Sequence, residues 1–333
     1  MQATLGFERP KHILSASQFN RAFLDYMYEL INQIRKFDKT KDGLMYLQSL
    51  LPHRRAMLYF TQPSTRTFMS FQAACTILGI KPSEIRDTAT SSERKGESID
   101  DSLRTFASYV DLIVMRAPVA GLSDRVATLL DATPRPVPII NAGSGPDEHP
   151  TQALLDIYTL QRSFKSAAGI EGKTICMVGD LKRGRTIRSL SRLLANYPRT
   201  RLIFCSPTEF KIADDLREFL RSRDVSFEET TNFTAAIEAA DAIYMTRVQD
   251  EYDQAGATKI DTRAYCLKQE HLPLLRRDSV IMHPLPRRDE LDPAIDHDPR
   301  AKYWRQERNG MWTRVALITI LMGVDSHIVL PTL

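Results

Sequence analysis

The sequence has few cysteines, and none is arranged as a metal-ligand or redox pair. Cys75, Cys176, Cys205 and Cys266 include no C-x-x-C spacing. Cys176 and Cys205 lie inside apolar runs, so buried reduced thiols are favoured over zinc ligands or disulfides. Long apolar runs are also lacking: "VALITILMGV" has 10 residues, whereas a membrane span needs about 20. With no signal-like N-terminus either, we expect a cytoplasmic protein that does not enter a membrane.

A large excess of one charge is absent as well. Lys and Arg number 45 against 41 Asp and Glu, a formal net charge of +4, and no Lys/Arg block resembles a nucleic-acid tail. We therefore expect no nucleic-acid partner. Hydrophobic residues make up 43% and charged residues 26% of the chain, which is typical of a globular protein. The 333 residues are enough for two domains.

Several well-known motifs are missing. The chain has no G-x-G-x-x-G, G-x-x-x-x-G-K-[ST], G-x-S-x-G or H-E-x-x-H segment. Dinucleotide binding, a phosphate-binding P-loop, a nucleophile elbow and a zinc-protease helix are therefore unsupported. We expect no metal and no cofactor.

The apolar pattern alternates between short strands and amphipathic helices. This pattern predicts strands at 55–62, 111–118, 136–143, 173–180, 200–206, 225–230, 241–247 and 279–286. It predicts helices at 15–37, 65–79, 98–110, 149–164, 185–197, 209–223, 232–240 and 310–323. Alternation of this kind indicates parallel sheets with right-handed crossovers. The expected fold class is α/β, with two doubly wound domains and an active site in the cleft between them.

Polar residues or turn chemistry follow six of the predicted strands. Ligands of such sheets bind beyond the carboxyl ends of the strands, which is where these residues fall. The clearest case is "PSTRT", where Ser64, Thr65, Arg66 and Thr67 open a helix. Free backbone N–H groups, hydroxyls and a guanidinium favour an anion such as phosphate there. An ordinary N-cap with a surface arginine explains the isolated motif equally well.

The remaining candidates are weaker one by one. A charge at Arg116, directly after an apolar strand, is costly unless it is paired or faces a ligand. His149 and Gln152 share one face at a helix start, although His149 alone could be a simple cap. Two further arginines and an amide suit a dicarboxylate, although each arginine alone could be a surface residue; they are Arg185, Arg247 and Gln249. This inventory, without a covalent nucleophile, favours electrostatic catalysis of group transfer from a phosphorylated donor.

Eight motifs in order across nearly the whole chain give a specific resemblance. They are "PSTRT", "KGES", "VMRAP", "NAGSGPDEHPTQALLDIYTL", "MVGDLKRGRT", "DAIYMTRVQ", "HPLPR" and "NGMWTRVAL". In these motifs the sequence resembles the aspartate/ornithine carbamoyltransferase family, and "GDLKRGRT", "YMTRVQ" and "HPLP" are similar to its aspartate-specific members. Ornithine-specific members would be expected to show S-M-G and "HCLP".

The resemblance implies a reaction of carbamoyl phosphate with L-aspartate that gives N-carbamoyl-L-aspartate and phosphate, a step of pyrimidine synthesis. It implies roles for phosphate binding (Ser64, Thr65, Arg66, Thr67), for polarising the carbamoyl oxygen (Thr67, Arg116, His149), for the carbamoyl nitrogen (Gln152 and the carbonyls of Pro284 and Leu285) and for aspartate (Arg185, Arg247, Gln249). Ser91 and Lys95 would come from a neighbouring subunit. The unit would then be a homotrimer with shared sites, and a higher assembly with regulatory or dihydroorotase chains is left open.

The implied domains are a carbamoyl phosphate-binding domain, 1–150 plus 308–333, and an aspartate-binding domain, 151–307. Some positions depart from the family pattern. Gln62 and Tyr252 stand where a Glu and an Arg are usual, and Phe68, which replaces a common Arg, is expected to be a packing residue. Three alternatives remain: another acceptor such as ornithine, a non-catalytic assembly paralogue, and a phosphate- or nucleotide-binding regulator.

Overall fold

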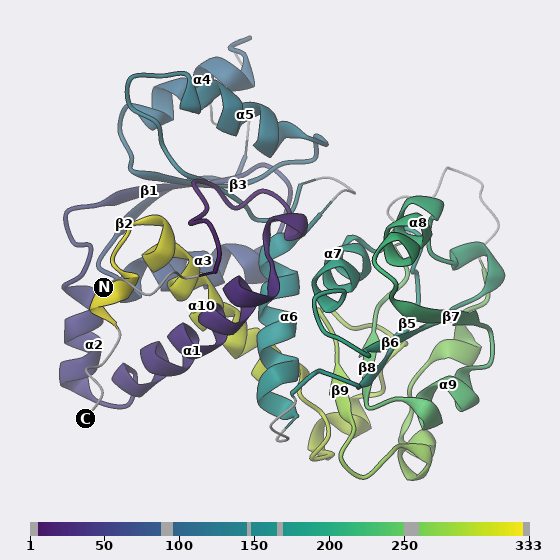
Figure 1. Ribbon diagram of the computed structural model, residues 1–333. Coiled ribbons are helices and arrows are strands. Elements are labelled where there is room, and N and C mark those ends of the chain that lie inside the picture. Colours follow the sequence, from purple (N-terminus) through teal and green to yellow (C-terminus); the bar gives the residue numbers. More distant parts are fainter. Residues whose placement is uncertain (1–5, 88–95, 145–147, 165–168, 250–259, 329–333) are drawn as a thin grey trace. The chain divides into compact units, whose positions relative to one another are not determined.

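The computed structural model describes residues 6–87, 96–144, 148–164, 169–249 and 260–328. The chain forms two compact units (Figure 1): unit 1 comprises Met1–Leu154 with Gly310–Leu333, and unit 2 comprises Leu155–Asn309. Within the described ranges, no helix is both long and apolar enough to cross a membrane.

Unit 1 is built on a parallel four-stranded sheet. Its order is β2-β1-β3-β4, from Lys81–Ile85, Arg55–Phe60, Leu112–Arg116 and Ile139–Asn141. Figure 1 shows α4 (Ile99–Ala107) and α5 (Leu122–Asp131) over one face, and α1 (Arg21–Phe37), α2 (Lys41–Gln48) and α3 (Thr65–Ile77) on the other. Side chains of α4 and α5 form one buried cluster with those of β1, β3 and β4.

Unit 2 has a parallel five-stranded sheet. Its order is β7-β6-β5-β8-β9, from Ser226–Thr230, Arg201–Cys205, Thr174–Val178, Ala242–Met245 and Val280–Met282. α9 (Phe233–Ala239) packs on one face in a cluster with alternate strand residues such as Cys176 and Val178. α7 (Arg185–Leu194) contacts the other face through Ser191 and Met177, and α8 (Asp214–Ser222) contacts α7. The predicted α/β fold with two parallel sheets is confirmed.

Two helices contain the positions at which the chain passes from one unit to the other. They are α6 (Pro150–Ser163) and α10 (Tyr303–Leu321). Pro150 occupies the first helical position, where its missing N–H leaves no bond unmade. The expected start of the last helix at 310 was wrong by seven residues. α2, β2 and α5 were not predicted.

The first predicted helix begins later than expected. α1 starts at Arg21 and is capped by Asn20, whose side chain accepts from the N–H of Phe23. Ser15 instead forms a capping box with Gln18 around a single 3-10 turn, and its hydroxyl donates to Glu148 at 2.9 Å. The first residue of the predicted helix, Ser15, therefore caps a separate short element that precedes α1.

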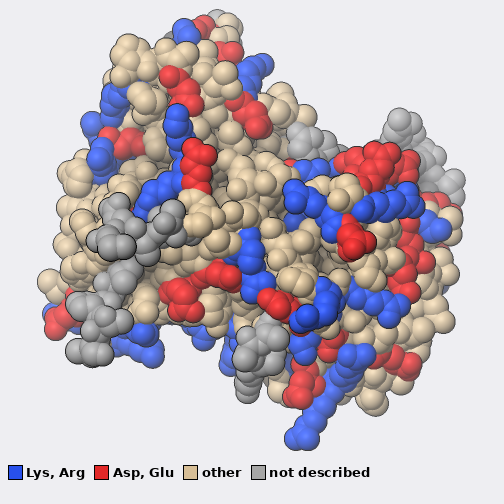
Figure 2. Space-filling view, viewed as in Figure 1, with Lys and Arg blue, Asp and Glu red and all other residues tan. Residues whose placement is uncertain are grey.

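The remaining expectations about buried residues are confirmed. All four cysteines are free and buried. Phe68 is 4% exposed and meets Phe60 edge-on, with ring centroids 5.4 Å apart, so it is a packing residue. The face of the molecule in Figure 2 carries Lys and Arg interspersed with Asp and Glu, and no broad basic surface appears on it.

Truncation in β1 tests how much the central strand contributes to unit 1. Leu58 is fully buried, so we expect Leu58→Ala to lower the free energy of unfolding by about 2–5 kcal/mol. The same change at Leu44 on α2, which is 40% exposed, should stay within about 1 kcal/mol. Denaturant titration measures both, and equal losses would contradict this placement of the core.

Candidate active site

Ser64–Thr67 lie between β1 and the first turn of α3. Ser64 is the N-cap residue but makes no side-chain capping bond, and the first turn of α3 carries no acidic residue. Thr67 is buried, whereas Thr65 and Arg66 are exposed. The turn therefore combines the backbone N–H groups of a helix N-terminus with hydroxyls and a guanidinium, groups whose chemistry suits a phosphate.

Arg116, the last residue of β3, is held in place by the loop after β4. Its side chain is 8% exposed, and Nη1 donates to the carbonyl of Ala142 at 3.1 Å. Gly143 has φ +104 and allows close approach: a Cβ built there would lie 2.8 Å from Arg116 Nη1 and 3.1 Å from His149 Cδ2. Arg116 and His149 therefore face the same glycine, and a side chain at 143 would push against both.

His149 and Gln152 begin α6 as predicted. The carbonyl of His149 accepts from the N–H groups of Gln152 and Ala153. The side chains of His149 and Gln152 are both buried. Thr151 Oγ1 lies 3.5 Å from His149 Nδ1. Just before them, Glu148 accepts hydrogen bonds from Ser15 Oγ and from the N–H of Ala16. The start of α6 is thereby tied to the N-terminal segment of unit 1.

Unit 1 thus brings three groups of predicted residues to one edge of its sheet. β1, β3 and β4 are parallel and adjacent in the order β1-β3-β4. Ser64–Thr67 follow β1, Arg116 ends β3, and His149 follows the loop after β4. A helix N-terminus with hydroxyls, together with a buried guanidinium and an imidazole at the same edge, suits a small phosphorylated carbonyl compound.

The predicted residues of unit 2 also collect at the carboxyl edge of its sheet. Arg185 opens α7, and Arg247 and Gln249 follow β8, the neighbour of β5. All three side chains are partly exposed. The backbone after β5 packs closely against the backbone after β8 at this edge, because a Cβ at Gly179 would lie 2.2 Å from the carbonyl oxygen of Thr246. Gly179 has φ +120, a conformation that glycine adopts without strain.

Asp180 is a residue of this edge that the sequence reading missed. It is fully buried, and its carboxylate accepts from Arg183 Nε at 2.6 Å and from the Gln249 N–H at 3.2 Å. It therefore joins the loop after β5 to the loop after β8. An acidic residue two positions after a buried strand was the available signal.

The turn after β9 carries Pro284 and Leu285, both partly buried. Leu285 has φ +51, in the left-handed region that non-glycine residues rarely adopt. Its N–H donates to His283 Nδ1 at 2.8 Å. An unusual conformation held by a specific bond is common at functional sites.

Two expected site residues, Ser91 and Lys95, lie outside the described residues, as does Tyr252. Within the described ranges, no three His, Cys, Asp or Glu side chains gather as metal ligands.

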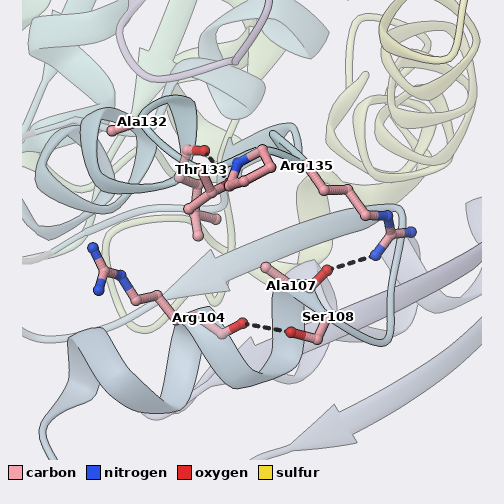
Figure 3. A pocket seen from close by; sticks show the side chains of 8 residues that line it. Arg104, Ala107, Ser108, Ala132, Thr133 and Arg135 are labelled. Atoms are coloured by element: carbon pink, nitrogen blue, oxygen red, sulfur yellow. Dashed lines mark hydrogen bonds between the residues drawn. The ribbon is translucent and has the colours of Figure 1, made fainter.

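A pocket of about 560 Å³ lies elsewhere in unit 1 (Figure 3). Its walls are the C-terminal ends of α4 and α5 and the segment after α5, where Arg135 donates to the carbonyl of Ala107 at 2.7 Å. α4 leads into β3 and α5 leads into β4, so this pocket is at the amino edge of the sheet. The candidate residues lie at the opposite edge, and the pocket is no part of their site.

Comparison with known proteins identifies the family of both units. Residues 11–162 match the model for "Aspartate/ornithine carbamoyltransferase, carbamoyl-P binding domain", and residues 171–321 match that for the "Asp/Orn binding domain". The chain is 37% identical over 323 residues to the "Aspartate carbamoyltransferase catalytic subunit" of Methanocella arvoryzae, covering 96% of this chain and 100% of that one. It is 36% identical over 321 residues to "Aspartate carbamoyltransferase 1, chloroplastic" of Pisum sativum, covering 93% and 78%.

Solved structures are similar over the same span. Aspartate transcarbamoylase from Trypanosoma cruzi, in complex with carbamoyl aspartate and phosphate, has a TM-score of 0.81 and 32% identity, covering 94% of this chain and 98% of that one. The catalytic subunit from M. jannaschii has a TM-score of 0.81 and 33% identity, with the same coverage. With both family models matched and relatives similar from end to end, the chain belongs to the aspartate/ornithine carbamoyltransferase family.

Proposed function

We propose that this protein is an aspartate carbamoyltransferase, which transfers the carbamoyl group of carbamoyl phosphate to the amine of L-aspartate in pyrimidine synthesis. The observation that carries the choice of acceptor is the carboxyl edge of the unit 2 sheet. Arg185 and Arg247 supply positive charge there, while Asp180 is buried and already accepts from Arg183 and Gln249. This edge suits a dicarboxylate better than the cationic side chain of ornithine.

The relatives support the same reaction. Trypanosoma cruzi aspartate transcarbamoylase, which is 32% identical to this chain, has been solved with carbamoyl phosphate and aspartate bound. In our proposal unit 1 binds carbamoyl phosphate and unit 2 binds aspartate, with the functional limits expected from the sequence, 1–150 plus 308–333 and 151–307. Transfer requires the two substrates to meet.

The proposed chemistry is electrostatic. The neutral amine of aspartate attacks the carbamoyl carbon, and negative charge grows on its oxygen, where Thr67, Arg116 and His149 would donate. Arg116 is oriented before the reaction by its bond to Ala142, so little reorganisation is needed. The bond between the carbamoyl carbon and the phosphate oxygen then breaks, and the phosphate takes up the proton that the amine loses. It leaves into the turn at Ser64–Thr67, assisted by the N-terminus of α3. Removing one such donor typically lowers the rate by about 10²–10³.

The remaining substrate contacts complete the site. Gln152 and the carbonyl oxygens of Pro284 and Leu285 would hold the carbamoyl nitrogen. Arg185, Arg247 and Gln249 would hold the two carboxylates of aspartate. We also propose a homotrimer in which Ser91 and Lys95 reach the site of a neighbouring subunit. A cytoplasmic location belongs to the same proposal, although plant relatives bear chloroplastic names.

Acceptor choice is the first test. The purified protein with carbamoyl phosphate should carbamoylate L-aspartate and leave L-ornithine unchanged. Arg66→Ala should lower kcat/KM by at least about 10²-fold, because a phosphate ligand is lost. Arg104→Ala, which removes an exposed guanidinium on α4, is the matched control and should stay near wild type. Product from ornithine would overturn the roles of Arg185, Arg247 and Gln249.

Gly143→Ala tests the placement of Arg116 and His149. The added methyl group would press on both side chains, so we expect kcat to fall by about tenfold or more. Gly121→Ala is the control, because its φ is +66 but nothing lies within 4 Å of the added methyl. Both variants should lose roughly 1–2 kcal/mol of stability from the left-handed backbone. Equal activity in the two would argue against this arrangement.

Mixing two inactive variants tests the shared site. If Arg66 and Lys95 come from different subunits, Arg66→Ala and Lys95→Ala chains, dissociated and reassociated together, should regain up to about a quarter of wild-type activity. The quarter follows from random pairing in a ring. The two variants assayed separately provide the baseline. No recovery, despite mixed trimers detected by native mass spectrometry, would place both residues in one subunit's site.

A further inference from the structure

His283, the first residue after β9, is buried and engaged at both ring nitrogens. Nδ1 lies 2.8 Å from the backbone nitrogen of Leu285, and only that N–H can donate, so Nδ1 is the acceptor. The ring proton of the neutral imidazole is therefore on Nε2. Nε2 lies 2.7 Å from Glu290 Oε1 and donates to that carboxylate.

Glu290 keeps the His283 ring in the tautomer that carries its proton on Nε2. Its Oε1 also accepts from the N–H of Arg288 at 2.9 Å. Burial alone would raise the pKa of Glu290, but the hydrogen bonds from His283 and Arg288 bring that pKa below its usual value. The carboxylate is thus ionised at neutral pH and accepts continuously, which favours the tautomer with Nδ1 unprotonated.

The turn that His283 controls is fixed at both ends. The backbone N–H of His283 donates to Gln306 Oε1 at 3.0 Å, and Gln306 in turn donates to the buried carboxylate of Asp156 at 2.7 Å. At the other end, the bond from Leu285 N–H to His283 Nδ1 spans the left-handed Leu285. The peptide carbonyls of Pro284 and Leu285 flank this restrained residue, so their directions depend on it.

We propose that His283 and Glu290 are a positioning pair that aims the carbonyl oxygens of Pro284 and Leu285 at the N–H groups of the carbamoyl donor. Neither side chain needs to touch the substrate, because His283 acts through the backbone of Leu285. This inference rests on the proposed function and adds two residues to it.

Two isosteric substitutions separate positioning from simple structural support. His283→Asn keeps an acceptor oxygen near the Nδ1 position but abandons Glu290. His283→Gln keeps a donor for Glu290 near the Nε2 position but removes the acceptor for Leu285. If the pair positions the turn, His283→Gln is the more damaging change for the carbamoyl donor. If His283 serves only as a hydrogen-bond donor to the Glu290 carboxylate, His283→Asn is the more damaging change, and it lowers stability and activity alike.

We expect His283→Gln to raise KM for carbamoyl phosphate about tenfold, the effect of roughly one lost hydrogen bond. His283→Asn should raise it about threefold or less. KM for aspartate and the inhibition constant of inorganic phosphate, which lacks the carbamoyl nitrogen, should stay within about twofold. Glu290→Gln, which keeps an acceptor oxygen, should lie near wild type, and Glu290→Ala should match His283→Gln.

The chain contains a matched control pair in unit 1. His12 is 7% exposed, accepts from the N–H of Ile139 at Nδ1 (3.0 Å) and contacts Asp131 through Nε2 (3.1 Å). His12→Gln therefore removes the same kind of acceptor, at the start of β4. It should lower the melting temperature but leave KM for carbamoyl phosphate within about twofold.

Calorimetric titration with phosphonoacetamide, which carries the same amide nitrogen without turnover, separates this inference from the proposed function. A wild type that forms no product would overturn the proposed function. Unchanged affinity for phosphonoacetamide in His283→Gln would overturn the positioning pair. A larger loss in His283→Asn than in His283→Gln would also overturn it, as would a parallel rise of KM for both substrates.

Discussion

Parallel strand pairing is the constraint on which both sites depend. Every strand of a unit points the same way, so the connections that follow the strands gather along one edge of each sheet. In unit 1 this edge collects the turn at Ser64–Thr67, the guanidinium of Arg116 and the start of α6. In unit 2 it collects Arg185, Arg247 and the turn after β9. The opposite edge of unit 1 carries Arg135, which is bonded to Ala107 and Asp111.

Buried hydrogen-bonded carboxylates fix the segments that carry these residues. Asp180 joins two loops, and Asp156 accepts from Tyr244 at 2.7 Å and from Gln306 at 2.7 Å, all of them buried. Burial raises the pKa of Tyr244 well above its usual value, so the phenol remains a donor. A buried carboxylate with several donors is stable, whereas loss of one neutral donor costs about 1–3 kcal/mol or more. Such anchors keep partly exposed ligand groups in fixed directions, which is what electrostatic catalysis requires.

Much of the fold and the site was predictable from local pattern. The apolar pattern predicted the positions of β1, β3 and β5 to within a few residues. The order of the motifs indicated the family. Boundaries were less predictable: the helix predicted from residue 15 begins at Arg21, and the Ser15 hydroxyl donates to Glu148, 133 positions away in the chain. The contacts of Asp180 and of His283 with Glu290 were also missed, because a motif such as "MVGDLKRGRT" or "HPLPR" shows which residues are present and not which groups they bond.

The sequence by itself determined which residues end the strands, since alternation of apolar runs and turn residues is encoded locally. It determined, too, the chemical types available there: hydroxyls, arginines, amides and a histidine. Only the tertiary structure decided which of them meet. Gly143 comes to lie against Arg116 because β4 pairs with β3, and Asp180 reaches Gln249 because β8 pairs with β5. Those pairings join segments far apart in the chain, and no local pattern specifies them.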